Sequence, residues 1–344
     1  MKKPILVIKF GTASITNKEG DLTDHVIADI ARQVAEVHSY YRIVLVSSGA
    51  VAAGRSYISN YKQRLSERKA AAAIGNTLLL NKYSDYFRPY GISIAQSLCE
   101  RNHFSNRKQF LQLKKTYEKL WDNGIIPIAN ENDVVSNLEL KFSDNDELAT
   151  LIAVGFNASL LLFSTSVPGV LDENNAIIRE LDTSDKKLLG LARKEKSDAG
   201  LGGMTSKLTY TRLANQMGIK AVIFGINTQD GILKALKDEA GTVCNARFCS
   251  VSAKNRWLAS GSLIKGKVKV DLGAEKALAK RFSLLAVGVQ SVVGDFEVGE
   301  VIEIIDHDDT TIAVAITKIS SKSLKENLNT QNLEVAHAND LVLV

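Results

Sequence analysis

Acidic side chains crowd into one short stretch of this 344-residue sequence. The segment NENDVVSNLELKFSDNDELATL, residues 130–151, lies between two apolar runs and holds six carboxylates: Glu131, Asp133, Glu139, Asp144, Asp146 and Glu147. Carboxylates this close repel one another unless water solvates them or cations and hydrogen-bond donors gather around them. Charge runs often face water, so the cluster indicates either a solvated loop or a site that holds cationic groups.

Two other segments carry residues suited to binding phosphate. Lys9 lies at the end of the apolar run ILVIKF, and Gly11 after it allows the backbone to approach an anion closely. In GLGGMTSKL, residues 200–208, three glycines precede a helical pattern that carries Lys207. Glycines leave amides accessible, a helix N-terminus has partial positive charge, and lysine adds a point charge. These features predict a phosphate cradle, and a glycine-rich linker with a surface lysine is the alternative.

Several familiar motifs are absent. No GxGxxG follows the first apolar run, which argues against a nicotinamide dinucleotide site. GSLIKGKV, residues 261–268, is close to a Walker A loop, but Val268 replaces the Ser or Thr and a strand pattern follows. The five histidines are scattered and the three cysteines form no CxxC pair, so we predict no protein metal site. Ser48 has no histidine in a neighbouring motif, so we expect it to form hydrogen bonds rather than act as a nucleophile.

Short β-type runs alternate with helix-length segments through about residue 225. Six runs are rich in apolar residues: 5–10, 42–48, 92–98, 125–130, 159–165 and 220–226. Between them, Val26, Ile30, Val34 and Val37 form one stripe at helical spacing, and residues 66–87 form a second helical pattern. Helices that alternate with fully apolar strands predict a mainly parallel sheet covered on both faces, which is a three-layer α/β/α sandwich.

In such a sheet, ligands bind at the carboxyl ends of the strands, where loops and helix N-termini converge. Three loops follow predicted strands and so belong to that edge: the turn after Lys9, the segment VSSGAVAAG with Ser48, and NEND at residues 130–133. A helix is predicted from DNDELATLIA, and Asp144 or Asn145 can cap it. Acidic residues are also favoured in its first turn.

The pattern changes after about residue 261, where one short helix and several strands broken by glycines indicate a small, mostly β domain. We therefore predict two domains, residues 1–261 and 262–344. The second holds nine Lys and Arg against twelve Asp and Glu, a balance of −3, whereas the whole chain carries +5. The basic excess thus belongs to the larger domain, where it favours small anionic ligands.

The composition, 45% hydrophobic and 24% charged, is typical of a globular protein. The start of the chain lacks the apolar core and cleavage site of a secretion signal. The most apolar segment, residues 151–163, is interrupted by Asn157 and Ser159 and is shorter than the roughly 20 residues that span a bilayer. We therefore expect a cytoplasmic enzyme without a membrane partner.

The segments VIKFGTASI, VSSGAVAAG, IANENDVV, FSDNDELATLIA and GLGGMTSKL, in this order and spacing, resemble the motifs of the amino acid kinase family. The combination of NEND, DNDELA and GGMTSK is similar to members that phosphorylate glutamate, more than to those acting on aspartate, carbamate or uridylate. The C-terminal part resembles the PUA domain that many such members carry. Ser166 departs from the pattern, because the family usually has Asp after the residue that corresponds to Thr165.

The resemblance implies ATP-dependent phosphorylation of the γ-carboxylate of L-glutamate, giving L-glutamyl 5-phosphate and ADP in the first step of proline biosynthesis. It implies that Lys9 and Lys207 grip the transferring phosphoryl group while Asp146 holds both lysines in place. Glutamate would bind to Ser48, Asp133 and Asn145, with Asp133 on the ammonium and Asn145 donating to a carboxylate. ATP, with Mg²⁺ bound to it, would contact these residues: Lys9, Gly11, Thr165, Ser166, Gly202, Gly203, Met204, Thr205, Ser206 and Lys207.

If the residues have these roles, only part of the acidic cluster is functional. We expect Asp144, Glu139 and Glu147 to be solvated, and Asp144 can also cap the helix. The resemblance also implies proline as a feedback inhibitor and a homo-oligomer, either a dimer or a tetramer. One alternative is a kinase of the same fold acting on aspartate, N-acetylglutamate or a nucleotide monophosphate. Another is RNA binding through the PUA-like domain, for which KGKVK at residues 265–269 is a local basic patch. The −3 balance of that domain argues against RNA as a partner.

Overall fold

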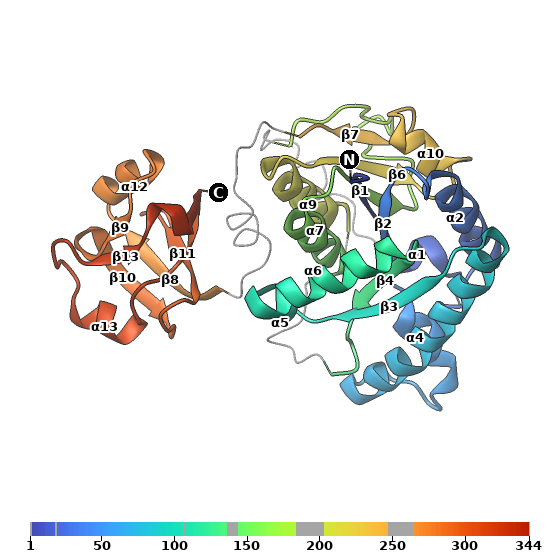
Figure 1. The fold of residues 1–344 in the computed structure, drawn as a ribbon, viewed down its shortest axis with the longest axis horizontal. Coiled ribbons are helices and arrows are strands. Elements are labelled where there is room, and N and C mark those ends of the chain that lie inside the picture. Colours follow the sequence, from blue (N-terminus) through green and yellow to red (C-terminus); the bar gives the residue numbers. More distant parts are fainter. Residues whose placement is uncertain are drawn as a thin grey trace. The chain divides into compact units, whose positions relative to one another are not determined.

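The computed structural model describes these stretches of the chain: residues 2–17, 19–105, 107–135, 144–183, 203–246 and 264–343. They belong to two compact units, the larger made of Met1–Glu100 and Leu111–Cys249 and the smaller of Arg101–Phe110 and Ser250–Val344 (Figure 1). Each unit has its own hydrophobic core. The predicted domain boundary near residue 261 lies outside the described residues and stays a prediction.

A seven-stranded sheet forms the centre of the larger unit. Its strands are β1 (Ile5–Phe10), β2 (Arg42–Ser47), β3 (Ile94–Cys99), β4 (Ile126–Glu131), β5 (Leu160–Thr165), β6 (Lys220–Gly225) and β7 (Thr242–Cys244). Their order is β3-β4-β2-β1-β5-β6-β7. Of these seven strands, only β7 is antiparallel to its neighbour. Lys9 of the central strand is in register with Val46 of β2 and Phe163 of β5. The carboxyl ends of β1, β2 and β5 therefore meet at one edge, as the sequence predicts.

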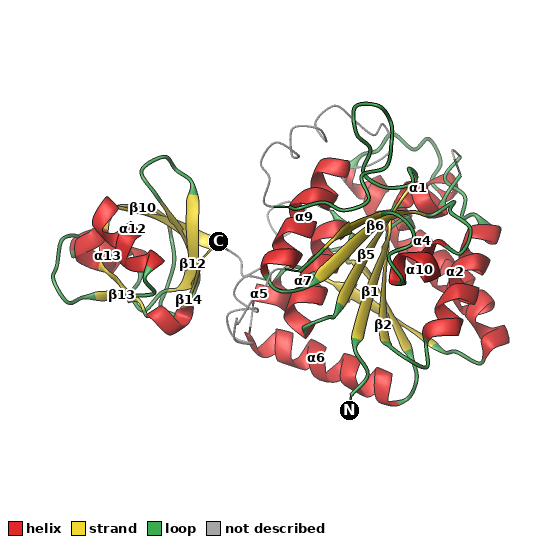
Figure 2. Ribbon diagram, turned by 90° about the horizontal axis from the view of Figure 1, so that it is seen from above, coloured by secondary structure: helices red, strands yellow, loops and turns green. Residues whose placement is uncertain are grey.

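Helices cover both faces of this sheet, so the predicted three-layer α/β/α sandwich is confirmed. The α-helices up to residue 236 are α1 (Thr12–Ile15), α2 (Asp24–Val37), α3 (Ala50–Gly54), α4 (Leu65–Phe87), α5 (Asn102–Ser105), α6 (Arg107–Asp122), α7 (Asn145–Phe156), α9 (Met204–Gln216) and α10 (Gly231–Leu236). Figure 2 shows α2, α4 and α10 on one face of the sheet and α6, α7 and α9 on the other.

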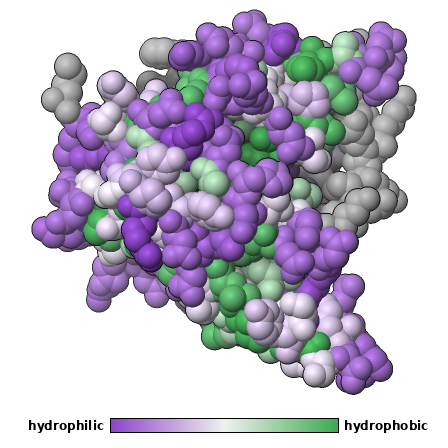
Figure 3. All heavy atoms as spheres, turned by 90° about the vertical axis from the view of Figure 1, so that its right-hand side faces the viewer, coloured by the Kyte–Doolittle hydropathy of each residue, from purple (hydrophilic) through white to green (hydrophobic). Residues whose placement is uncertain are grey.

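Helix α2 shows how an apolar stripe attaches a helix to the sheet. Ile30 and Val34 are fully buried, as predicted, and Ile27 is buried beside them. Val26 and Val37 are only partly buried, because the face in contact with the sheet is centred between them on Ile27, Ile30 and Val34. The face shown in Figure 3 is mostly hydrophilic, with several separate groups of hydrophobic side chains. Among the described residues, no helix is long and apolar enough to span a membrane.

Two glycines allow α3 and α4 to cross in direct backbone contact. A Cβ atom on Gly75 would lie 1.7 Å from the carbonyl oxygen of Ala50, and one on Gly54 would lie 2.0 Å from that of Ala71. No real side chain fits at such distances, so only glycine permits this crossing. The crossing holds the turn after β2, which contains Ser48, against the middle of α4.

The smaller unit is mostly β, as predicted, and its main sheet has the order β10-β8-β11-β12-β14. The strands of this unit are β8 (Ile264–Val270), β9 (Leu284–Leu285), β10 (Val289–Gly294), β11 (Val301–Ile305), β12 (Thr311–Ile316), β13 (Glu334–Ala336) and β14 (Leu341–Leu343), and β9 and β13 pair with each other. Its α-helices include α12 (Leu272–Ala279) and α13 (Ser321–Glu326). On β8, Lys267 pairs with Glu303 and Lys269 with Asp309, each at 2.8 Å. The basic patch KGKVK is therefore largely neutralised by acids of its own unit.

Candidate active site

Three buried charged side chains meet at the carboxyl edge of the large sheet. Lys9 comes from the end of β1, Asp146 from the first turn of α7 and Lys207 from the first turn of α9. The carboxylate of Asp146 lies 2.6 Å from Nζ of Lys9 and 3.2 Å from Nζ of Lys207. The side chain of Asp146 is fully buried, and those of the lysines are only 5% and 7% exposed. The structure thus brings together three residues that the sequence placed far apart.

The trio carries one positive charge in excess. Burial by itself would raise the pKa of Asp146, but the ammonium groups of Lys9 and Lys207 outweigh it and hold that pKa below its ordinary value. Burial lowers the pKa of Lys207, Asp146 opposes this change, and Lys9 adds to it by charge repulsion. Two lysines against one carboxylate in a poorly solvated place favour the approach of an anion.

Asp144 connects the two helices that carry this chemistry. Of the two candidates from the sequence, Asp144 and Asn145, it is Asp144 that caps α7, accepting hydrogen bonds from the backbone amides of Asp146 at 2.9 Å and Glu147 at 3.1 Å. Its other carboxylate oxygen accepts a hydrogen bond from the hydroxyl of Ser206 in the first turn of α9. One side chain therefore fixes the distance between the helix N-termini that present Asp146 and Lys207.

The expectation that Glu147 is solvated is wrong. Its side chain lies in a helix of which ten of twelve residues are buried, and the residue itself is only 6% exposed. Because α7 is enclosed on all sides in its first turns, no face of the helix is left for water. Glu131 at the end of β4 is also buried, at 5% exposure. Glu139 lies outside the described residues.

A group of polar side chains lies beside the charged trio. Nδ2 of Asn145 donates to Oγ of Ser48 and to Oδ1 of Asn130, both at 2.9 Å, and Nδ2 of Asn130 donates to Oδ1 of Asn76 at 2.9 Å. The predicted substrate residues Ser48 and Asn145 are therefore in contact. Sequence reasoning missed Asn130 and Asn76. Asn130 is the first residue of the NEND motif, whereas nothing in the helical pattern around Asn76 distinguishes it.

Asp133, the third predicted substrate residue, lies in the turn that follows β4. β4 pairs with β2 in parallel, so this turn and the one with Ser48 leave the same edge of the sheet. Asp133 is partly exposed.

The predicted nucleotide residues follow β1 and β5 and begin α9. A Cβ atom on Gly11 would lie 3.5 Å from Nζ of Lys9, so a side chain here would be in van der Waals contact with the ammonium group. Thr165 ends β5 and Ser166 after it is exposed. Gly203 is the N-cap of α9 and has no side chain to occupy the amides of the first turn, where these residues lie: Met204, Thr205, Ser206 and Lys207. Gly202 lies outside the described residues.

These features fit a nucleotide phosphate: a helix N-terminus whose N-cap is a glycine, a second glycine beside an ammonium group, and an excess of positive charge. Within the described stretches, no cluster of three or more His, Cys, Asp or Glu could hold a metal ion by itself.

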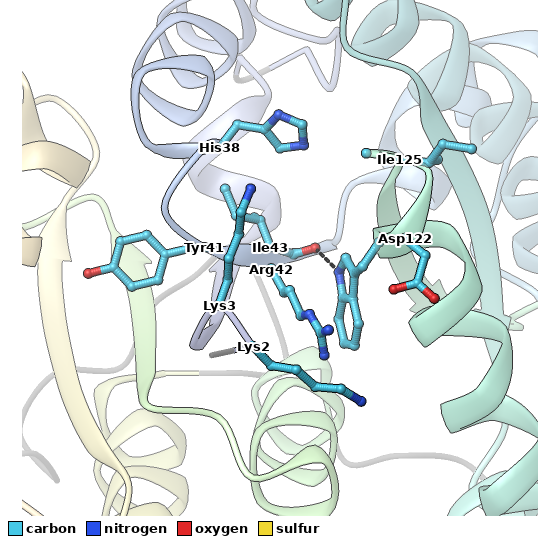
Figure 4. A pocket seen from close by; sticks show the side chains of 10 residues that line it. Lys2, Lys3, His38, Tyr41, Arg42, Ile43, Asp122 and Ile125 are labelled. Atoms are coloured by element: carbon cyan, nitrogen blue, oxygen red, sulfur yellow. Dashed lines mark hydrogen bonds between the residues drawn. The ribbon is translucent and has the colours of Figure 1, made fainter.

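A cavity of about 510 Å³ opens at the opposite edge of the sheet, where the strands begin (Figure 4). Trp121 forms one wall, donates from Nε1 to the carbonyl of Ile43 at 2.9 Å, and lies 5.7 Å from the Arg42 guanidinium, measured to the ring centroid. Burial lowers the pKa of His38 in this cavity, and nearby Lys3 lowers it further. No residue predicted for binding or catalysis lines it, because Lys3 and Arg42 stand at the amino ends of β1 and β2.

Comparisons with known proteins agree with this geometry. A model of the amino acid kinase family matches residues 4–225, and a model of the PUA domain matches residues 266–337. A glutamate 5-kinase from Thermotoga maritima is 37% identical over 325 residues, covering 93% of this chain and 90% of that protein. The chain belongs to the amino acid kinase family. Its C-terminal part matches the PUA domain.

Other amino acid kinases extend the likeness. Glutamate 5-kinase 1 from Bacillus licheniformis is 34% identical over 364 residues and covers the whole of both chains. Among solved structures, UMP kinase from Ureaplasma parvum has a TM-score of 0.51 at 15% identity, covering 71% of this chain and 97% of that one. Giardia carbamate kinase has a TM-score of 0.51 at 18% identity, covering 72% and 100%. At these identities the two structures establish the shared fold alone.

Proposed function

We propose that this chain transfers the γ-phosphoryl group of ATP to the γ-carboxylate of L-glutamate, giving L-glutamyl 5-phosphate and ADP. The observation that carries the proposal is the buried trio of Lys9, Asp146 and Lys207, which lies beside the contact between Ser48 and Asn145 at one edge of the sheet. The relatives named glutamate 5-kinase, which match along nearly the full chain, support glutamate as the acceptor.

The chemistry requires charge neutralisation more than proton transfer. A carboxylate acceptor is ionised above about pH 4, so it attacks phosphorus without a general base. The obstacle is repulsion between two anions, and fixed ammonium groups lower it most where water is excluded. Lys9 would contact the phosphoryl oxygens from strand β1 and Lys207 from helix α9, and Asp146 keeps both nitrogens within reach of one point.

The nucleotide would lie over the carboxyl ends of β1 and β5. Amides of Gly203 and the residues after it would hold the phosphates at the N-terminus of α9, with Gly11 leaving room beside Lys9. Mg²⁺ bound with the nucleotide would supply further charge neutralisation. Thr165 and Ser166 would contact the nucleoside part of ATP. Ser166 offers a hydroxyl group there, in place of the carboxylate of the Asp that is usual in the family.

Asp133, Ser48 and Asn145 would bind the amino-acid substrate, with Asp133 paired to its ammonium group. This role separates glutamate from N-acetylglutamate, whose amine carries no charge. The reaction would make the chain the first enzyme of proline biosynthesis, with proline as a feedback inhibitor, and we propose that it works as a homo-oligomer.

The test is ADP release by the purified full chain with ATP and Mg²⁺ and one acceptor at a time: L-glutamate, L-aspartate, N-acetyl-L-glutamate or UMP. We expect turnover with glutamate, and kcat/KM at least about 100-fold lower with each of the others. Hydroxylamine, which traps acyl phosphates, should give a hydroxamate only with the accepted carboxylate. Equal or greater turnover with another acceptor would assign the chain a different activity within the family.

A further inference from the structure

Four polar side chains form one connected hydrogen-bonded chain beside the charged trio: Ser48, Asn145, Asn130 and Asn76. They come from four places, the turn after β2, the start of α7, the end of β4 and the middle of α4. Asn130 and Asn76 are buried, at 4% and 6% exposure. Every bond in the chain is 2.9 Å long. What such a chain offers to a ligand depends on which atom donates in each bond.

A backbone amide sets that direction. The N–H of Glu131 donates to Oδ1 of Asn130 at 2.9 Å, and a backbone N–H can only donate. Oδ1 of Asn130 is therefore an acceptor, so Asn145 must approach it with Nδ2. The same assignment leaves Nδ2 of Asn130 as a donor, and it meets Oδ1 of Asn76. Each amide orientation thus follows from one fixed group.

The fixed direction determines what the site offers to a ligand. The two hydrogens of Asn145 Nδ2 are taken by Ser48 and Asn130, and its Oδ1 is buried without a partner among the described residues. Ser48 accepts from Asn145, which leaves its own hydroxyl hydrogen for another acceptor. Nδ2 of Asn76 is also buried without a partner in the described part of the chain.

The geometry therefore assigns opposite polarities to the two substrate residues: Ser48 donates to the α-carboxylate of the acceptor, and Oδ1 of Asn145 accepts from its α-ammonium group. This inference rests on the proposed function and changes the donor role that the sequence resemblance gives to Asn145. Asn76 is a positioning residue in this arrangement. Its Oδ1 accepts a hydrogen bond from Nδ2 of Asn130 and so holds Asn130 in the orientation that directs Asn145.

The backbone explains why Asn76 can do this. It follows Gly75, where α4 contacts the carbonyl of Ala50, the first residue of α3, which directly follows the turn that carries Ser48. The glycine crossing therefore places Asn76 and Ser48 at fixed positions on the two sides of Asn130 and Asn145. A polar residue at this point of an otherwise largely buried helix face has a partner in Asn130 rather than in water.

Asn76→Leu removes the acceptor for Asn130 while keeping a side chain of similar size. We expect the KM for glutamate to rise about 10-fold or more, the KM for ATP to change less than about 3-fold, and the melting temperature to stay within a few degrees of wild type. Asn81→Leu, the same change at an exposed position of α4, is the matched control and should alter neither KM. If Asn76→Leu does not fold, Asn76→Ser, which is too short to reach Asn130, should give the same split. An unchanged glutamate KM in either folded variant would overturn the positioning role.

The polarities are tested with two competitive inhibitors that each lack one group. Glutarate lacks the ammonium and 4-aminobutyrate lacks the α-carboxylate, so wild type should bind both more weakly than glutamate. The quantity compared is the factor by which each inhibitor binds more weakly than glutamate. In Ser48→Ala this factor should shrink about 10-fold for 4-aminobutyrate and stay unchanged for glutarate. In Asn145→Ala it should shrink for glutarate and stay unchanged for 4-aminobutyrate. A reversed pattern, or no change in either ratio, would refute the assignment. ADP release by the wild-type protein with glutamate separates a failure of this inference from a failure of the proposed function. If wild type turns over glutamate, a negative result refutes only the donor and acceptor roles assigned here. If wild type does not turn over glutamate, the proposed function fails as well.

Discussion

The carboxylate of Asp146 lies 2.6 Å from the ammonium nitrogen of Lys9, and both side chains are buried. A buried carboxylate that faces two lysines is the only negative charge of the trio, so removing it leaves two like charges together. Asp146→Asn should lower the free energy of unfolding by about 3–5 kcal/mol and reduce kcat strongly. Urea unfolding and ADP release measure the two effects. Asp122→Asn, at an exposed carboxylate, is the control and should change neither.

The same carboxylate gives a pH dependence of stability. The pKa of Asp146 is below 3.8 in the folded protein, and the unfolded chain titrates near 3.8. Between these values the unfolded chain binds more protons, so the contribution of Asp146 is present above about pH 4 and is lost as pH falls through its folded pKa. Urea unfolding from pH 6 to pH 3 should show a smaller loss of stability in Asp146→Asn than in wild type. Parallel curves for the two proteins would contradict this account of the carboxylate.

Asp144 joins the first turns of α7 and α9, so its loss should affect both stability and turnover. We expect Asp144→Ala to cost about 1–2 kcal/mol through the lost cap and to lower kcat, because the spacing of Asp146 and Lys207 is no longer fixed. Asp144→Asn keeps an acceptor for the helix amides and should retain most of the stability. Thermal unfolding and kcat distinguish the variants, and an alanine variant as stable as wild type would exclude the capping role.

The crossing of α3 and α4 depends on Gly75. Gly75→Ala places a Cβ within 1.7 Å of a backbone oxygen, so the helices must separate, at a cost above about 3 kcal/mol. Gly91→Ala is the comparison, because its Cβ meets open space and only the left-handed backbone at φ +67° is strained, costing roughly 1–2 kcal/mol. Chemical unfolding should rank the two in this order. An equal loss of unfolding free energy in the two variants would mean that the crossing of α3 and α4 does not need the close contact with Ala50.

Asp133 tests recognition of the amino group. Asp133→Asn removes a charge but keeps the size of the side chain, so we expect the KM for glutamate to rise about 10- to 100-fold with a smaller change for ATP. Steady-state kinetics with each substrate varied in turn gives both values. Equal changes in the two KM values would refute a specific contact with the substrate ammonium.

The larger fold could be predicted because its signals are local. Each of the six predicted strands is found within two residues of its expected ends, since fully apolar runs bounded by turns have one stable place in a parallel sheet. Topology then explains why Lys9 and Asp133 share an edge although more than a hundred residues separate them. The cap at Asp144 was predictable for the same reason, because capping depends on neighbours in sequence.

Contacts between distant segments could not be predicted in this way. Nothing in the residues around Asn76 indicates that it meets Asn130, because the partner is chosen by the crossing of α3 and α4. The bond from Ser206 to Asp144 likewise depends on how α9 lies against α7. The burial of Glu147 was missed because charge at a helix start suggests solvent, whereas the enclosure of α7 by the rest of the unit decides its exposure.

The central claim is that Lys9 and Lys207 neutralise the transferring phosphoryl group. The most direct measurement is kcat for ADP release in Lys9→Ala and Lys207→Ala, with Lys237→Ala, at an exposed lysine, as the matched control. The account predicts a fall of about 100- to 1,000-fold or more in each of the first two, in proteins that keep their fold by circular dichroism, and no change in the third. Near-normal turnover in a folded Lys9→Ala or Lys207→Ala variant would contradict it.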